Sequence, residues 1–263
     1  MPGMTPDRIA AQLWTVRSLI TDGASLSRVL AGIKAIGYAA VQISGVPGAI
    51  PAAEIRQRCR QAGLAICATH EPARDICENP QKVIDRLGEL GCRDTAYPFP
   101  HVPLADLASV ERLAAQLDAA GAALRRAGLR LSYHNHDHEF VRVQGRSVLE
   151  WIFDLTAAAH LHAEPDTYWV QCGGADPAAW CSRFPRRLPL LHLKDYAVRL
   201  RDGNPERTQA ELGQGQLDWP AIIAAAREAG CEWYIVEQDT CSGDPLDSLR
   251  ISWDHLAAFL RRS

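Results

Sequence analysis

Short hydrophobic stretches alternate with longer amphipathic ones along the whole chain. Each short stretch has the length of a strand, about 4 to 8 residues, and ends in polar residues. The longer stretches repeat apolar positions every three or four residues, as Leu113, Leu117, Ala120 and Leu124 do, which is the period of a helix with one buried face. The pattern therefore predicts strand and helix units in alternation.

Eight such units follow one another. We predict strands at residues 9–14, 39–43, 65–70, 94–98, 129–136, 161–166, 188–192 and 233–237. We predict helices at residues 26–36, 52–62, 81–90, 104–127, 146–155, 177–183, 219–229 and 246–261. Glycines close several of these helices just before the next strand, which is a common helix stop signal. The longest connection, residues 198–216, is polar and is predicted to be a loop.

Repeated strand and helix units require parallel strands joined by right-handed crossovers, and eight units can close into a ring. We therefore predict an α/β fold of the (β/α)8 TIM barrel class, with residues 1–263 as a single domain. A doubly wound open sheet is the alternative. Its glycine-rich phosphate turn, GxGxxG after the first strand, is replaced here by Thr15-Val16-Arg17-Ser18, which favours the barrel.

Composition and charge indicate the kind of partner. A hydrophobic content of 47% in 263 residues is enough for a large core. The formal net charge of -3 gives no field that would hold a nucleic-acid backbone or an anionic membrane surface. We find neither an apolar run of about 18 residues nor a secretion signal in residues 1–8, so a cytoplasmic location is expected. The eight cysteines lack paired spacing and are expected to be reduced thiols. A small-molecule partner is favoured.

Four consecutive predicted strands, the fifth to the eighth, end in an imidazole or a carboxylate: His134, Asp166, His192 and Glu237. In a barrel, such side chains converge at the carboxyl ends of the strands. Singly, each residue could be a hydrogen-bonded structural group, but four such groups are costly to bury without a cation. Two imidazoles and two carboxylates suit Mn²⁺, which we favour, or Co²⁺, Zn²⁺, Mg²⁺ or Fe²⁺. We therefore predict a divalent metal site.

Catalytic groups are expected beside this site. Glu237 is the first candidate for a general base. Lys194 shares a strand face with His192 and could donate a proton or stabilise an enediolate. A salt bridge from Lys194 to Asp195 or Glu211 would explain this lysine equally well.

Further polar and aromatic groups lie near the predicted strand ends. His136 repeats the inward parity of His134 and could act as a second acid or base, or contact the substrate. The candidates for substrate binding are Gln12, Gln42, His70, Tyr97, Trp14 and Trp169. The polar members suit a polyol, and the tryptophans could stack on a sugar ring, although packing explains these residues equally well.

Seven segments resemble the xylose-isomerase-like barrels known as sugar phosphate isomerases/epimerases, which include the inosose dehydratases. They are residues 11–17, 41–45, 133–140, 166–170, 192–196, 217–222 and 235–239, so the resemblance covers nearly the whole chain. It implies a TIM barrel that acts on a sugar or polyol by metal-dependent isomerisation, epimerisation or dehydration.

In this family the metal shell is usually Glu, Asp, His and Glu. Carried over by position, Asp166, His192 and Glu237 match, while His134 stands in place of the first glutamate. Glu139 is an alternative for the missing glutamate if the strand bends. The epimerase members use both glutamates to move protons on opposite faces of the substrate. With one of the pair, the resemblance implies proton abstraction next to a carbonyl, leading to isomerisation or to β-elimination, rather than two-base epimerisation.

The substrate is expected to be an unphosphorylated sugar, keto-sugar or inosose, because the chain has no glycine-rich phosphate cradle. Two other functions stay open. An endonuclease-IV-like phosphodiesterase would share the barrel but needs more metal ligands and a surface that grips DNA. A catalytically silent sugar-binding subunit is compatible with the change to His134. Because related barrels often self-associate through their outer helices, a homo-oligomer is possible.

Overall fold

Eight parallel strands form the centre of this computed structural model, which describes residues 4–262. They are β1 (Ile9–Gln12), β2 (Ala40–Ile43), β3 (Ala65–His70), β4 (Asp94–Tyr97), β5 (Arg130–His134), β8 (Leu161–Glu164), β9 (Leu190–Leu193) and β12 (Trp233–Val236). Hydrogen bonds join them in the order β8-β5-β4-β3-β2-β1-β12-β9, and a parallel bridge between Asp166 and His192 connects the two ends. The predicted TIM barrel is confirmed; residues 1–3 and 263 of the predicted domain lie outside the described residues.

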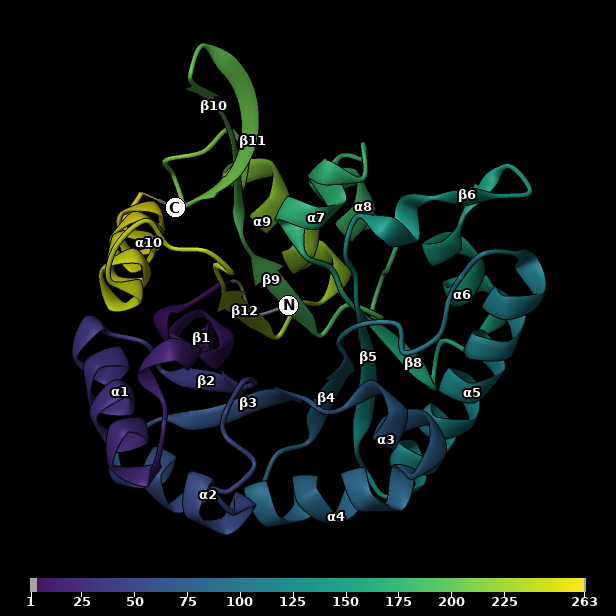
Figure 1. The fold of residues 1–263 in the computed structure, drawn as a ribbon, viewed down its shortest axis with the longest axis horizontal. Helices are drawn as coiled ribbons and strands as arrows, with labels where there is room; N and C mark the ends of the chain where they lie inside the picture. The colour runs from purple at the N-terminus through teal and green to yellow at the C-terminus, as the bar shows by residue number, and fades with distance from the viewer. Residues whose placement is uncertain (1–3, 263) are drawn as a thin grey trace.

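Helices surround the strands on the outside of the ring (Figure 1). Those that correspond to the predicted helices are α1 (Gly23–Ile36), α2 (Ala52–Gln61), α4 (Pro80–Leu90), α5 (Leu107–Arg126), α6 (Val148–Leu155), α8 (Pro177–Ser182), α9 (Trp219–Ala229) and α10 (Pro245–Leu260). Side chains of Asp22, Asp106 and Ser147 cap α1, α5 and α6, because each accepts a hydrogen bond from an otherwise free backbone N–H. Within the described chain, every helix is too short or too polar to cross a membrane.

The strands carry two layers of inward side chains. A lower layer is apolar and consists of Ala10, Ala40, Ala68, Leu190 and Ile235. Two residues further along the same strands stand Gln12, Gln42, His70, His192 and Glu237. Because side chains alternate across a strand with a period of two, the polar set lies directly above the apolar one. The alternation places a polar layer at the carboxyl ends of the strands, where a barrel has its active mouth.

Two β-hairpins and two short helices were not predicted. The segment predicted as a polar loop at residues 198–216 instead contains most of an antiparallel pair, β10 (Asp195–Arg201) and β11 (Asn204–Ala210), which projects from the barrel (Figure 1). Its tip is Asp202-Gly203, both with positive φ, which is a strong hairpin signal. A smaller hairpin joins β6 (Arg142–Val143) to β7 (Arg146–Ser147). The helices α3 (Ala73–Glu78) and α7 (Thr167–Cys172) are too short to show a helical period.

The eight cysteines are free thiols, as the sequence predicts. Most of them are buried, and burial raises the pKa of Cys59 and of Cys92 to about 12. A thiol with so high a pKa is not a nucleophile at neutral pH. These two residues therefore act as small apolar groups in the core.

Candidate metal centre and substrate cavity

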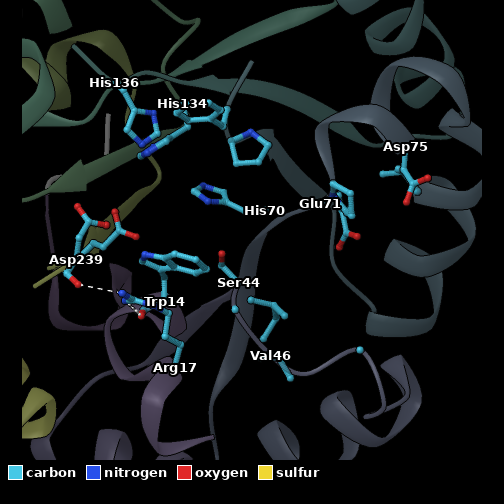
Figure 2. A pocket seen from close by; sticks show the side chains of 18 of the residues that line it. Trp14, Arg17, Ser44, Val46, His70, Glu71, Asp75, His134, His136 and Asp239 are labelled. Atoms are coloured by element: carbon cyan, nitrogen blue, oxygen red, sulfur yellow. Dashed lines mark hydrogen bonds between the residues drawn. The ribbon is translucent and has the colours of Figure 1, made fainter. Parts of the chain in front are cut away.

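A cavity of about 960 Å³ opens above the polar layer. His70, His134 and Glu237 line it at the level of the strand ends, and Trp14 and Trp169 also face it. Figure 2 shows His134 and His136 near His70, and Trp14 below them in the view. The cavity is large enough for a small organic ligand.

The four predicted metal ligands lie together; His134 and Glu237 line the cavity, whereas Asp166 and His192 are wholly buried and do not. Donor atoms of His134, Asp166, His192 and Glu237 are all within 4.8 Å of one another, and all four residues are buried. His192 Nδ1 is 2.9 Å from Glu237 Oε2 and 3.9 Å from Asp166 Oδ2. His134 Nδ1 is buried and has no hydrogen-bond partner in the described structure. An unpartnered imidazole nitrogen beside carboxylates is the arrangement that a divalent cation would satisfy.

A buried glutamate that the sequence analysis missed, Glu164, adjoins this group. It pairs in register with His134 on the neighbouring strand and is wholly buried. Its carboxylate contacts His70 Nε2 at 2.7 Å, and together with His70, His134 and His192 it forms a second group of four possible ligands. Burial opposes its ionised form, but His192 and His70 outweigh burial and lower the pKa of Glu164 to about 2. Glu164 shares its strand face with Asp166, so inward parity could have identified it.

Glu164 also fixes the orientation of His192 through Gln42. The Gln42 amide nitrogen donates to Glu164 Oε1 at 2.7 Å, so the Gln42 carbonyl faces His192 Nε2 at 2.6 Å. His192 must donate its Nε2 proton there, and this leaves Nδ1 on the side of Glu237. Burial disfavours a charged ring, but Glu164 and Glu237 raise the pKa of His192 to about 10. In the metal-free protein, the Nδ1 proton is therefore the one that a cation would displace.

Replacing Glu164 with glutamine tests this relay. The variant loses the charge that holds His70 and Gln42, so we expect a metal affinity about 10 to 100-fold weaker than that of the unchanged protein. Titration with Mn²⁺, followed by electron paramagnetic resonance of the free ion, measures the effect. Glu89→Gln, an exposed change on α4, is the control. Equal affinities for the two variants would show that the relay does not orient His192.

Lys194 is buried beside the candidate ligands and is 1% exposed. Its Nζ atom is 2.9 Å from Asp166 Oδ2, 2.8 Å from Glu237 Oε2 and 2.8 Å from Asp239 Oδ2. Burial disfavours the ammonium, but the three carboxylates outweigh burial and raise the pKa of Lys194 well above its usual value. The lysine is therefore a fixed positive charge inside the candidate site.

The alternative salt bridges of Lys194 do not form. Asp195 instead accepts hydrogen bonds from the backbone of Gly213 and Gly215 and from Trp219 Nε1, at 2.9 to 3.1 Å. It thereby ties the base of the β10–β11 hairpin to the start of α9. The Glu211 carboxylate accepts hydrogen bonds from the Ser248 hydroxyl and from the Gln238 side-chain nitrogen. The ion pairs of Lys194 are therefore made with Asp166, Glu237 and Asp239.

His136 faces the cavity, whereas the Glu139 carboxylate does not reach the candidate metal ligands. His136 Nδ1 is buried without a hydrogen-bond partner among the described residues, and burial lowers the pKa of His136 to about 4. Its imidazole is therefore neutral at pH 7. The Glu139 carboxylate accepts from Tyr133 Oη at 2.9 Å and from the His136 backbone at 2.8 Å. These bonds hold it in the wall, so it belongs to neither group of possible ligands.

The predicted substrate-binding residues fall into two sets. Trp14, His70 and Trp169 line the cavity. Gln12, Gln42 and Tyr97 are wholly buried and do not line it, so their part in substrate binding stays a prediction. The two glutamines hydrogen-bond to each other at 2.9 Å, and Tyr97 Oη bonds His101. Gln12 Oε1, by contrast, is buried without a hydrogen-bond partner in the described residues.

Several cavity residues were not predicted. Asp239 follows Glu237 by two positions, so the same strand parity indicates it. Gln209, at the base of β11, accepts a hydrogen bond from the Asp239 backbone N–H at 2.7 Å. Its side-chain nitrogen donates another to the Asp239 carboxylate at 2.6 Å. Phe99 projects at the mouth with 54% of its surface exposed. No sequence periodicity marks Gln209 or Phe99, because both lie outside the eight barrel strands.

Comparison with known protein families gives one match: the model of the xylose isomerase-like TIM barrel family covers residues 30–262. Comparison with curated proteins finds no match.

Solved structures share the fold. A sugar phosphate isomerase/epimerase from Parabacteroides distasonis is 22% identical, with a TM-score of 0.81 over 98% of this chain and 96% of that one. An L-ribulose 3-epimerase is 16% identical, with a TM-score of 0.73 over 97% and 95% of the two chains. A xylose isomerase-like TIM barrel protein from Mycobacterium smegmatis, solved in complex with magnesium, is 14% identical, with a TM-score of 0.73 over 96% of each chain. At these identities the likeness concerns the fold.

Proposed function

This chain belongs to the xylose isomerase-like TIM barrel family, and from that premise we propose that it is a divalent-metal-dependent enzyme acting on a sugar, keto-sugar or inosose. The reaction we propose is proton abstraction next to a carbonyl, leading to isomerisation, epimerisation or elimination of a leaving group. One observation carries this proposal: two imidazoles and two carboxylates converge, buried, beside an open cavity.

The metal would be held by His134, Asp166, His192 and Glu237, whose donor atoms lie within 4.8 Å of one another, and the buried His134 Nδ1 atom beside this group has no hydrogen-bond partner in the described residues. Mixed nitrogen and oxygen ligands favour Mn²⁺, with Co²⁺, Zn²⁺, Mg²⁺ or Fe²⁺ as alternatives. A divalent ion there would polarise the carbonyl and hydroxyl oxygens of a sugar.

The protein's own groups would move the proton. Burial opposes the ionised form of Glu237, but Lys194 and His192 keep its pKa well below the usual value. Glu237 is thus a carboxylate at neutral pH, able to accept a proton from the carbon beside the carbonyl. The ammonium of Lys194 would stabilise negative charge that develops on oxygen. Neutral His136 would bind a substrate hydroxyl or return a proton.

The position of His134 narrows the reaction. His134 stands at the position of the family's first glutamate, and burial lowers the pKa of His134 well below its usual value, so the chain offers a neutral imidazole there and not a second carboxylate base. A single carboxylate base favours isomerisation or β-elimination over two-base epimerisation.

Removing the metal tests the proposal. We expect chelated, dialysed protein to lose more than about 10²-fold in turnover of ketoses and inososes, and added Mn²⁺ to restore it. Deuterium exchange at the carbon next to the carbonyl, followed by NMR in D₂O, measures proton abstraction directly, and elemental analysis verifies that the metal is gone. Unchanged exchange in metal-free protein would contradict the proposal.

A further inference from the structure

The cavity extends beyond the candidate metal centre. Figure 2 shows Glu71 and Asp75 on one side of His70, and Asp239 on the other. The volume of about 960 Å³ lies at the upper end of the range of about 300–1000 Å³ for pockets that enclose drug-sized ligands. A single hexose is smaller than such ligands. Space therefore remains in the cavity when one sugar ring lies above the candidate metal centre.

The additional space, which we name the outer lobe, is bounded by Ser44, Val46, Glu71, Asp75, Lys82 and Arg86. These residues come from the connection after β2, the connection after β3 with α3, and α4. None of them was indicated by the strand-end pattern. They lie on the loop side of the barrel, where specificity residues are carried.

Two ion pairs supply the polar groups of the outer lobe. Arg86 Nε is 3.0 Å from Glu71 Oε2, and Lys82 Nζ is 2.8 Å from Asp75 Oδ2. Glu71 is 4% exposed, so its carboxylate is fixed. The two terminal nitrogens of Arg86 make no hydrogen bond to the described residues. A guanidinium with free donors beside a fixed carboxylate matches adjacent hydroxyl groups, which both donate and accept.

An aromatic side chain, Trp14, also lines the cavity. Trp14 is 38% exposed, and its ring is held by the Arg17 guanidinium at 4.3 Å and by close approach to Gly45. A Cβ atom at Gly45 would come within 2.8 Å of the Trp14 ring. Trp14 is therefore a rigid apolar face of the kind on which a sugar ring stacks.

We propose that the substrate carries a second hydroxylated ring, so that it is a disaccharide or a related glycoside. One ring lies above the candidate metal centre and the second binds in the outer lobe through Arg86 and Glu71. This inference rests on the proposed function for the identity of the first ring. It adds the substrate class, which the candidate metal ligands alone do not indicate.

Binding measurements test the inference without turnover. Calorimetric titrations use glucose and cellobiose as probes with the unchanged protein, Arg86→Ala and the control Arg60→Ala, an exposed change on α2. We expect cellobiose to bind at least 10-fold more tightly than glucose. Arg86→Ala should weaken the affinity for cellobiose at least 10-fold and the affinity for glucose less than 2-fold. Arg60→Ala should change neither affinity.

A second variant separates binding from structure. Ser44→Phe fills the outer lobe and leaves both ion pairs in place, so it should remove the preference for cellobiose and keep glucose binding. Cellobiose that binds no more tightly than glucose, or an equal loss of both sugars in Arg86→Ala and Ser44→Phe, would overturn the inference. Metal-dependent turnover of a monosaccharide would then still support the proposed function. Conversely, cellobiose preference without metal dependence would remove the proposed chemistry alone.

Discussion

Turnover is expected to fall about 10³-fold when Glu237 is replaced by glutamine. The substitution keeps the shape of the side chain but removes the carboxylate that accepts the proton, and general bases contribute about 10² to 10⁴-fold to such steps. It also removes one anionic partner of Lys194 and of His192. We therefore expect the apparent affinity for Mn²⁺ to fall as well, because the donor set loses a negative charge. Deuterium exchange into the substrate and Mn²⁺ titration measure the two effects separately.

Glu228→Gln is the matched control for this experiment. Glu228 is an exposed residue of α9, outside the cavity, so its substitution should leave exchange and Mn²⁺ affinity unchanged. Circular dichroism of both variants verifies the fold. If Glu237→Gln retains exchange within a factor of about 10 at saturating Mn²⁺, another group is the base, and His136 is the next one to change.

The barrel could be predicted from sequence because its signals are local. Each strand is short, the long helices such as α5 have one buried face, and inward apolar residues such as Ala10 and Ile235 precede inward polar ones by two positions. The approach of His134, Asp166, His192 and Glu237 followed from topology, since consecutive strands of a closed ring bring their ends together.

The fate of the polar side chains at strand ends could not be predicted in the same way. Gln12 and Gln42 have the composition and position of substrate-binding residues, yet they bond each other and Glu164. Whether an amide faces a cavity or another amide depends on side-chain distances between residues 30 to 122 positions apart. Sequence parity gives the face of the strand, and only the packed structure gives the partner.

The short elements could not be predicted for a different reason. The six residues of α7 hold too few turns for a period to emerge, although Asp166 caps this helix by accepting from the Trp169 N–H. The β10–β11 hairpin carried a usable signal in Asp202-Gly203 and in the alternation of Val198 and Leu200 with Arg199 and Arg201 in β10, but β11 shows no alternation of apolar and polar residues. Its exposed faces need no such pattern, because the hairpin projects away from the core.

Replacing Lys194 with methionine is expected to destabilise the metal-free protein by about 3 to 5 kcal/mol, the cost of leaving buried charges without their partner. Asp166 and Glu237 would keep their burial and lose the cation that neutralises them. Burial already raises the pKa of Asp166 to about 6 despite the attraction of Lys194. Without the lysine this pKa would rise further, so the loss of stability should be smaller at pH 5, where Asp166 takes up a proton, than at pH 8.

A divalent ion should reverse part of this loss, and that response is what distinguishes a metal centre from a buried salt-bridge network. Bound Mn²⁺ would restore positive charge among the same carboxylates and would stabilise the folded state by mass action. Guanidinium denaturation with chelator and with Mn²⁺ measures both states, and Lys34→Met on the exposed face of α1 should change the free energy of unfolding by less than about 0.5 kcal/mol. A Lys194→Met protein that is destabilised but gains nothing from Mn²⁺, Co²⁺ or Mg²⁺ would show that Lys194 itself is the only cation these carboxylates accept.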